Sequence, residues 1–220
     1  MRTLNISSRE SHLFKLYKQI KDKIEKRLKE FEEIYKNGND EKVFEELVFC
    51  ILTPQTKALD CDRAVKILKR NDLLLKGKRE EISKKISFIR FKNHKADYIL
   101  KAREFFFKEG EGNFKKFLSS FKDEKKLRDE LVKKIKGIGL KEASHFLRNI
   151  GISKNLVIVD RHILRCAFKY KIIKKMPKTI TKKNYLDIEN KILKFSKKIG
   201  ITPNHLDFLF WYDSNNYFFK

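Results

Sequence analysis

Apolar residues recur at helical spacing from the start of the chain. From Leu13 to Ile34, leucine, isoleucine and phenylalanine follow one another at steps of three and four residues, with lysine and glutamate between them. This spacing places the apolar side chains on one stripe of an α-helix and the charged side chains on the opposite face. The pattern predicts a long amphipathic helix that ends at Asn37-Gly38-Asn39, because glycine and asparagine favour helix ends.

The same periodicity continues along most of the chain. It predicts a helix over residues 40–52 and, after the break at Thr53-Pro54-Gln55, another through Lys69. Later helices are predicted over residues 78–88, 93–109, 113–121, 124–135, 141–149, 161–169, 183–198 and 203–212. Only residues 156–159, with the sequence LVIV, resemble a strand, and four residues are too few to require a sheet. We therefore expect an all-α fold.

The charge of the chain narrows the class of its partner. Its 220 residues include 53 lysines and arginines but only 29 aspartates and glutamates, which gives a net charge of +24. Residues 121–180 alone hold 17 basic and 6 acidic side chains. An excess of this size favours a polyanionic partner, with nucleic acid ahead of an acidic membrane surface.

Several other classes of protein are disfavoured. No segment approaches the roughly 20 apolar residues of a membrane span, and the start MRTLNISSRESHLF lacks the apolar run of a signal peptide. Cys50, Cys61 and Cys166 are odd in number and widely spaced, which favours a reducing compartment and no disulfide framework. We expect a soluble cytoplasmic protein with no membrane partner.

The most informative segment is LVKKIKGIGLKEASHFLRN at residues 131–149. An amphipathic helix ends at Gly137, and a second helix begins near Leu140. Gly137 and Gly139 permit positive φ and a close approach of the backbone, while Ile138 can pack between the helices. The amides at the start of the second helix could bind a phosphate. The pattern predicts a helix-hairpin-helix that grips the DNA backbone, although an ordinary turn between helices has the same spacing.

Two charged residues near this turn could carry chemistry. Lys141 lies in the first turn of the second helix, where the helix dipole opposes a positive charge by about 0.3–1 kcal/mol and favours the neutral, nucleophilic amine. Asp160 directly precedes the helix predicted over residues 161–169, a position typical of an N-cap. Each residue alone is compatible with a structural role, but with the hairpin they form a candidate nucleophile–carboxylate pair.

With these residues, the segment KIKGIGLKEASHFLRNIGISKNLVIVDRHILR resembles the helix-hairpin-helix and Gly/Pro-Asp loop of the base-excision DNA glycosylase superfamily. Its details are most similar to the type 2 8-oxoguanine DNA glycosylase/lyases of archaea and some bacteria. Upstream, ILTPQTKA at residues 51–58 and IRFKNHKA at residues 89–96 resemble two further landmarks of the superfamily. The sequence WYD at residues 211–213 and the final Lys220 resemble the type 2 family.

The chain departs from the superfamily pattern in two places. The loop before Asp160 contains Gly151 but no proline. The four-cysteine cluster that follows this motif in many endonuclease III relatives is missing, since Cys166 stands alone. We therefore expect no metal and no other cofactor.

The resemblance implies a bifunctional enzyme. Lys141 would attack C1′ of a flipped-out nucleotide, displace the damaged base and form a Schiff base, after which β-elimination would cut the strand on the 3′ side. Asp160 would stabilise positive charge on the sugar and help to deprotonate Lys141. Monofunctional relatives keep the aspartate but lack the lysine, so the resemblance implies lyase activity here.

The resemblance also implies residues that contact the DNA. Gln55 is a candidate wedge into the gap left by the flipped nucleotide. The hairpin residues Gly137, Ile138 and Gly139 would hold the DNA backbone.

A further set of residues would recognise the damaged base. Phe91 and Trp211 could stack on the flipped purine, although core packing is an alternative for both. Lys220 would reach the base pocket if the apolar tail before it docks. A hydrogen-bond acceptor beside N7 would favour 8-oxoguanine, because N7 becomes a donor in the oxidised base.

By resemblance, the fold would consist of two helical subdomains with a DNA cleft between them. Residues 1–40 and 161–220 would form one subdomain, and residues 41–160 the other, with the helix-hairpin-helix at about 127–149. We expect a monomer that acts on double-stranded DNA with an oxidised base, in the prokaryotic cytoplasm and associated with the nucleoid.

Two alternative functions remain open at this point. One is an endonuclease III-like glycosylase for oxidised pyrimidines, which the missing cysteine cluster and the final lysine disfavour. The other is a helix-hairpin-helix DNA-binding module without catalysis.

Overall fold

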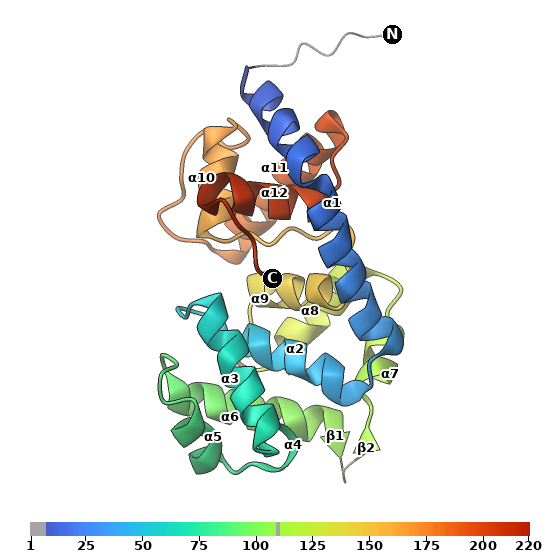
Figure 1. Ribbon diagram of the computed structural model, residues 1–220, viewed down its shortest axis with the longest axis vertical. Helices are drawn as coiled ribbons and strands as arrows, with labels where there is room; N and C mark the ends of the chain where they lie inside the picture. Colours follow the sequence, from blue (N-terminus) through green and yellow to red (C-terminus); the bar gives the residue numbers. More distant parts are fainter. Residues whose placement is uncertain (1–7, 109–110) are drawn as a thin grey trace. The chain divides into compact units, whose positions relative to one another are not determined.

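A computed structural model describes residues 8–108 and 111–220, which are largely helical (Figure 1). The first six helices are α1 (Ser8–Asn37), α2 (Asp40–Leu52), α3 (Ala58–Arg70), α4 (Leu73–Lys76), α5 (Arg79–Lys85) and α6 (Lys92–Phe106). The others are α7 (Phe114–Ser119), α8 (Glu124–Lys134), α9 (Leu140–Asn149), α10 (Arg161–Lys169), α11 (Lys182–Ile199) and α12 (Pro203–Asn215). Two short strands, β1 (Phe107–Lys108) and β2 (Glu111–Gly112), pair antiparallel. Residues 1–7, which contribute to the signal-peptide interpretation, lie outside the described residues.

The predicted all-α fold is confirmed. Each helix expected from the apolar spacing has a counterpart close to its predicted position. The helix predicted over residues 93–109 ends at Phe106, because the chain enters β1 there. Residues 156–159 form no strand.

Contacts between Cα atoms divide the chain into two compact units. Unit 1 consists of residues 1–30 and 154–218, and unit 2 consists of residues 31–153 and 219–220. One boundary falls inside α1 and another falls after α9. Each unit has buried apolar residues of its own.

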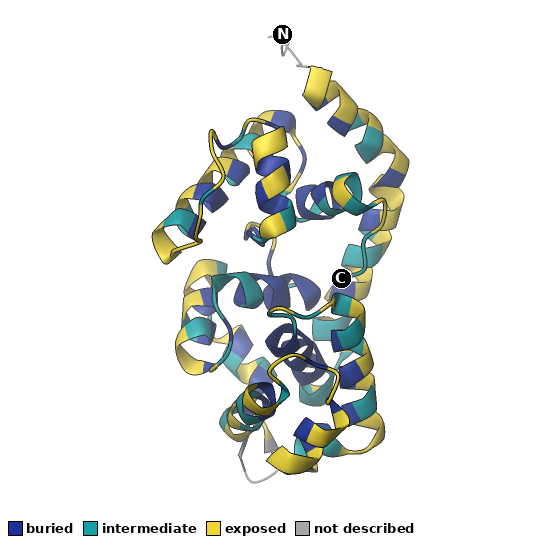
Figure 2. Cartoon of the chain, turned by 90° about the vertical axis from the view of Figure 1, so that its left-hand side faces the viewer, coloured by how far each residue is buried: buried dark blue, intermediate teal, exposed yellow. Residues whose placement is uncertain are grey.

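Unit 2 is built around α2 and α9. All residues of α2 from Val43 to Leu52 are buried, and the helix contacts α3, α6, α7 and α9 (Figure 2). Stacked rings extend this core, with centroids 3.7 Å apart for Phe106 and Phe114 and 5.5 Å apart for Phe114 and Phe146. Burial of these large apolar side chains is the main stabilising contribution, and it fixes α9 against α2.

Unit 1 contains α10, α11, α12 and most of α1. The Tyr17 hydroxyl on α1 lies 2.9 Å from Nδ1 of His205 on α12. On α11, the Tyr185 hydroxyl donates to the carbonyl oxygen of Val157 at 2.7 Å, and Glu189 accepts from the Val157 amide at 3.1 Å. These bonds anchor the segment that leads to Asp160.

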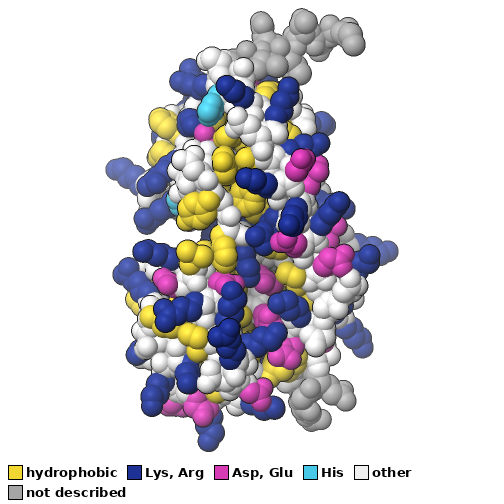
Figure 3. All heavy atoms as spheres, viewed as in Figure 1, with side chains coloured by type: hydrophobic (Ala, Val, Ile, Leu, Met, Phe, Trp, Pro, Cys, Tyr) yellow, Lys and Arg dark blue, Asp and Glu magenta, His cyan; other side chains and the backbone are white. Residues whose placement is uncertain are grey.

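Basic side chains dominate the surface shown in Figure 3. Several acidic side chains pair with lysines one turn away on the same helix, as Glu25 does with Lys21 and Asp97 with Lys101. None of the described helices is long and apolar enough to cross a membrane. The basic side chains expected from the composition therefore lie on the surface, where a polyanionic partner could reach them.

Candidate functional site

The turn between α8 and α9 has the predicted hairpin geometry. Helix α8 ends at Lys134 and α9 begins at Leu140. Between them, Gly137 has a φ of 90°, and a Cβ there would overlap the ring of Tyr98 on α6. Ile138 is buried, as expected for the apolar residue of the turn. Glycine is therefore required at position 137 by both its conformation and its surroundings.

The second glycine of the turn does not use the positive φ that glycine permits. Gly139 has a φ of −111° and is the N-cap of α9. Its amide donates a hydrogen bond to Oε2 of Glu142 at 3.1 Å. A carboxylate thus occupies one of the amides that were expected to bind phosphate, which agrees with the preference of helix N-termini for anions.

Lys141 is the second residue of α9 and follows the hairpin directly. Its side chain is 25% exposed. Within the described residues, its Nζ pairs with Oε1 of Glu142 at 3.8 Å, a distance too long for a hydrogen bond. The amine is therefore partly exposed and is not held by a strong hydrogen bond, as a nucleophile requires.

Two buried side chains show that Lys141 and Lys220 share one electrostatic neighbourhood. Burial lowers the pKa of His145 well below its ordinary value, and the charges of Lys141, Arg148 and Lys220 lower it further. Burial also raises the pKa of the Cys50 thiol, while the charges of Lys141 and Lys220 act in the opposite direction. The fold therefore brings these two lysines near the same part of α2 and α9.

The ammonium of Lys220 is bound by acidic groups of unit 2. Its Nζ lies 2.8 Å from Oε1 of Glu46, 3.6 Å from Oδ1 of Asp62 and 4.5 Å from the ring centroid of Phe49. Glu46 is only 3% exposed, and its Oε2 accepts a hydrogen bond from Asn149 at 3.2 Å. A buried carboxylate needs such partners, because an unpaired charge in the interior is strongly destabilising. Lys220 is therefore docked on α2.

Two exposed turns of unit 2 have left-handed backbones. Gln55, between α2 and α3, has a φ of 55°, and Phe91, the N-cap of α6, has a φ of 59°. Phe91 is 50% exposed, so it is not a core residue. Non-glycine residues in this conformation cost about 1–3 kcal/mol each and are concentrated at functional sites.

A hollow of about 270 Å³ connects these turns to the hairpin. It is lined by Pro54, which precedes Gln55, by Phe91 and by Gly137. Ile51 of α2 and three side chains of α6, including Lys95, complete the lining. The structure thus brings the predicted wedge turn, Phe91 and the hairpin together within unit 2.

Asp160 belongs to unit 1 and begins α10. Its Oδ1 accepts a hydrogen bond from the amide of Ile163 at 2.8 Å, which confirms the predicted N-cap. The residue is only partly buried. The cap therefore fixes the orientation of a carboxylate that solvent can still reach.

Trp211 also belongs to unit 1 and is partly exposed. Its ring lies against the imidazole of His162, with centroids 4.1 Å apart and planes inclined by 31°. Asn215 donates to the carbonyl oxygen of Trp211 at 3.0 Å and lies 3.4 Å from Nδ1 of His162. The indole is supported by these contacts but is not enclosed in the core, so it retains surface for stacking.

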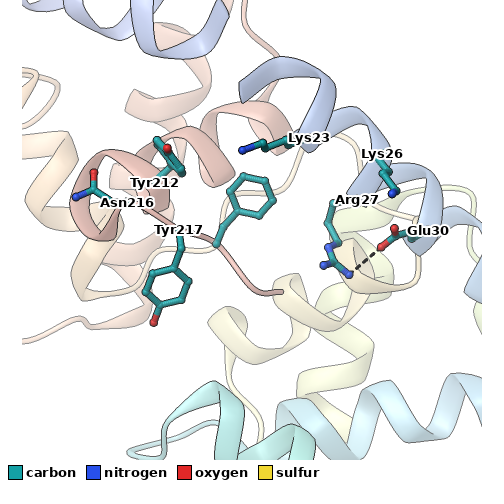
Figure 4. Close-up of a pocket in the computed structure, with 8 residues that line it drawn as sticks. Lys23, Lys26, Arg27, Glu30, Tyr212, Asn216 and Tyr217 are labelled. Carbon is teal, nitrogen blue, oxygen red and sulfur yellow. Dashed lines mark ion pairs between the residues drawn. The ribbon is translucent and has the colours of Figure 1, made fainter. Parts of the chain in front are cut away.

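Unit 1 contains a second hollow, of about 380 Å³, that sequence reasoning did not anticipate (Figure 4). It combines basic side chains of α1 with aromatic side chains of α12 and the tail after it. The lining residues are Lys23, Lys26, Arg27, Glu30, Tyr212, Asn216, Tyr217 and Phe218. Helical spacing alone marks these α1 residues as a solvated face, because their aromatic neighbours lie far along the chain.

Sequence reasoning also missed two charged residues that hold candidate site residues in place. Glu46 on α2 binds Lys220, and Lys95 on α6 binds the turn that contains Gln55. The available signal for Glu46 was a glutamate within the apolar run of α2. Lys95 offered little signal among so many lysines.

Known proteins resemble this chain over nearly its full length. The family model for 8-oxoguanine DNA glycosylase matches residues 24–201. The 8-oxoguanine DNA glycosylase/AP lyase of Fusobacterium nucleatum is 43% identical over 206 residues, which cover 94% of this chain and 95% of the relative. The enzyme of the same name from Methanocaldococcus jannaschii is 41% identical over 197 residues, which cover 88% of this chain and 90% of the relative.

A solved structure resembles the fold. The crystal structure of the Methanocaldococcus jannaschii 8-oxoguanine glycosylase/lyase, in complex with a 15mer DNA containing 8-oxoguanine, has a TM-score of 0.84 and 38% sequence identity. The similarity covers 95% of this chain and 100% of that chain. The resemblance first found in the hairpin, Lys141 and Asp160 is thereby confirmed at the level of the family. This chain belongs to the 8-oxoguanine DNA glycosylase family.

Proposed function

We propose that this chain excises 8-oxoguanine from duplex DNA and then cuts the strand at the resulting abasic site. The observation that carries the proposal is the partly exposed amine of Lys141 in the first turn of the helix after the hairpin. The relatives that are 43% and 41% identical to this chain are named 8-oxoguanine DNA glycosylase/AP lyases. Their names supply the substrate, and Lys141 supplies a nucleophile suited to both steps.

The basic surface and the hairpin of unit 2 would hold the DNA. The backbone at Gly137 and Ile138 would contact phosphates, because the tight turn lets another molecule approach closely. At Gly139, a phosphate would replace the Glu142 carboxylate as the acceptor for the amide. The damaged nucleotide must leave the base stack before chemistry, at a cost of a few kcal/mol. Gln55 would fill the space that it leaves, since this residue is exposed on a left-handed turn.

The flipped base would be recognised by stacking and by one hydrogen bond. Phe91 and Trp211 both retain exposed aromatic surface and would stack on the purine. A backbone oxygen of Lys220 beside N7 would accept a hydrogen bond from 8-oxoguanine and repel the lone pair of normal guanine. The ion pair between Lys220 and Glu46 supports this role, because it fixes the residue in the neighbourhood of Lys141.

The chemistry would proceed through a covalent intermediate. The neutral amine of Lys141 attacks C1′ while the bond from C1′ to N9 breaks, and the base leaves with that electron pair and takes up a proton. Loss of a proton from the attached nitrogen and opening of the sugar ring give a Schiff base. Removal of a proton from C2′ then expels the 3′ phosphate, and water releases Lys141. Asp160 would stabilise the positive charge on the sugar and take the proton from Lys141.

We further propose that the enzyme works as a monomer on nucleoid DNA in the prokaryotic cytoplasm. All the proposed residues belong to one chain, so no second copy is needed to supply a catalytic group. The named relatives come from prokaryotes.

Three duplexes test the proposed function: one with 8-oxoguanine opposite cytosine, one with thymine glycol, and one undamaged. We expect base release and strand cutting on the 8-oxoguanine duplex alone, and neither step with the Lys141→Gln variant. Release from thymine glycol alone would assign the chain an endonuclease III-like activity. Binding of DNA without release from any duplex would leave a non-catalytic DNA-binding module.

A further inference from the structure

A buried lysine of unit 2 is fully occupied by hydrogen bonds. Lys95 on α6 is 3% exposed. Its Nζ donates to the carbonyl oxygens of Leu52 at 2.7 Å and Pro54 at 2.8 Å, and to Oγ1 of Thr56 at 2.8 Å. An ammonium has three hydrogens, so all three are used within the protein.

The three acceptors surround Gln55. Leu52 is the last residue of α2, where a helix leaves carbonyl groups without an internal partner. Pro54 and Thr56 lie immediately before and after Gln55, so the ammonium binds the chain on both sides of that residue. Gln55 itself is exposed and left-handed, and such a conformation persists only where the surroundings enforce it.

The same lysine connects this turn to Phe91. The amide of Lys95 donates to the carbonyl oxygen of Phe91 at 3.0 Å, one helical turn earlier. Phe91 is the N-cap of α6 and is also exposed and left-handed. The side chain of Lys95 therefore ties the Gln55 turn to the start of α6. Gly137 of the hairpin lines the hollow that both turns share.

Burying a charged side chain to hold a turn has a large desolvation cost. Burial lowers the pKa of Lys95 to about 8, yet the group stays mainly protonated at neutral pH. Burying an ammonium requires that every hydrogen be satisfied, and an apolar side chain of similar size would avoid the desolvation. Unlike an apolar side chain, the ammonium can orient three oxygen atoms at once through hydrogen bonds. All three oxygens belong to the segment that carries Gln55.

We infer that Lys95 is a positioning residue for the opening of the duplex at the lesion. Its ammonium holds the Gln55 turn and the start of α6, which carries Phe91, in a fixed arrangement, and the two turns enter the base stack together. This inference rests on the proposed function. It adds a residue that touches neither the base nor the reacting sugar. Because the two turns are already ordered in the free protein, their insertion into the base stack costs less conformational entropy, and the complex with opened DNA is favoured.

The test measures opening apart from chemistry. The duplex carries 2-aminopurine next to 8-oxoguanine, and the Lys141→Gln background prevents excision. We expect Lys95→Met to reduce the equilibrium constant for opening at least about tenfold, which is about 1.4 kcal/mol. The matched control is Lys101→Met, which removes the same charge from the same helix at an exposed ion pair with Asp97. It should change opening by less than about twofold.

A double-mutant cycle tests whether Lys95 acts through the turn. We expect Gln55→Ala to reduce opening, and Lys95→Met to add little in the Gln55→Ala protein, because residues that act as a unit are not additive. Thr56→Val removes one of the three bonds and keeps the ammonium, so a loss of about threefold is expected even if Lys95→Met fails to fold. Full additivity, or normal opening with Thr56→Val, would overturn the inference.

A second substrate separates this inference from the proposed function. A single-stranded oligonucleotide with an abasic site needs Lys141 for cutting but needs no duplex opening. When Lys141 is retained, the Lys95→Met variant should cut this single strand at the parent rate but should excise 8-oxoguanine from the duplex more slowly than the parent. A parent protein that cuts neither substrate would contradict the proposed function. A parent protein that cuts both, with a Lys95→Met variant that opens the duplex normally, would overturn the role of Lys95 alone.

Discussion

Two lysines of unit 2 occupy opposite environments. Lys95 is enclosed, and its three ammonium hydrogens all point at protein oxygens within 2.8 Å of Nζ. Lys141 lies at the start of α9 with a quarter of its side chain exposed, and its Nζ is 3.8 Å from Oε1 of Glu142. One lysine therefore holds structure, while the other has an amine that a substrate can reach.

The difference shows that a lowered pKa is not sufficient to identify a nucleophile. Burial lowers the pKa of Lys95 to about 8, a value typical of catalytic lysines. Its nitrogen is nevertheless inaccessible and bonded on all sides, so it cannot approach C1′ of a nucleotide. Access and the absence of competing hydrogen bonds decide in favour of Lys141.

The largest expected effect comes from removing the accessible amine. Lys141→Gln should reduce strand cutting on the 8-oxoguanine duplex at least about 10⁴-fold, because the nucleophile is lost. Single-turnover cutting measures the effect. Lys76→Gln, at an exposed ion pair with Asp72 on α4 and outside the hairpin, is the control and should change the rate less than about threefold. If the Lys141→Gln variant cuts at a rate within tenfold of the parent rate, Lys141 is not the nucleophile, and its exposed amine does not set it apart from Lys95.

The next effect concerns the carboxylate proposed to serve Lys141. Asp160→Asn keeps an N-cap side chain, since asparagine caps helices as well as aspartate, but removes the charge. We expect excision to fall about 10²–10⁴-fold with little change in the free energy of unfolding. Asp160→Ala should in addition lose about 1 kcal/mol of stability. If Asp160→Asn excises at the parent rate, the residue is only a cap.

The next prediction concerns the pH dependence of the free energy of unfolding, which depends on His145, a buried residue one helical turn after Lys141. The pKa of buried His145 is lowered well below 6.5, so below pH 6.5 the unfolded chain takes up a proton that the folded chain does not. Stability is therefore full above pH 6.5 and falls as the pH drops below that value.

Urea unfolding at pH 7.5 and pH 5 measures this effect. His145→Gln should lose less stability between these two pH values than the parent protein does. His94→Gln, which alters an exposed histidine of the same unit, should behave like the parent. Equal acid sensitivity in the parent and in His145→Gln would show that His145 does not carry the effect.

The smallest effect expected here concerns a third lysine, Lys220, which is paired with Glu46. Glu46→Gln removes the charge that holds the ammonium, so we expect about a tenfold loss in the preference for 8-oxoguanine over guanine. The preference is the ratio of the two excision rates. Glu45→Gln is a matched control, because Glu45 is adjacent on α2 and binds Lys42 at 2.8 Å. Equal losses in both variants would remove Lys220 from base recognition.

Local patterns in the sequence predicted most of the fold. The helices follow from apolar side chains at steps of three and four residues, a pattern that survives in any tertiary context where one face is buried. Helix α4 and strands β1 and β2 escaped prediction because each spans at most four residues, too few to show a period.

The candidate site was only partly accessible to sequence reasoning. The hairpin, Lys141 and the cap at Asp160 were found because each belongs to a continuous motif. Glu46 and Lys95 were missed because their roles depend on contacts with Lys220 and with the Gln55 turn, which are distant in sequence. Candidate catalytic residues could be proposed from local sequence, whereas the contacts that hold them in place required the folded structure.

The most direct test is to trap the intermediate and locate its attachment. Borohydride added during the reaction with an 8-oxoguanine duplex should reduce the Schiff base to a stable adduct, and peptide mapping by mass spectrometry should place it on Lys141. Adduct on Lys95 or Lys220 would contradict the distinction drawn between accessible and enclosed lysines. A reaction that releases the base without any adduct would contradict the covalent mechanism itself.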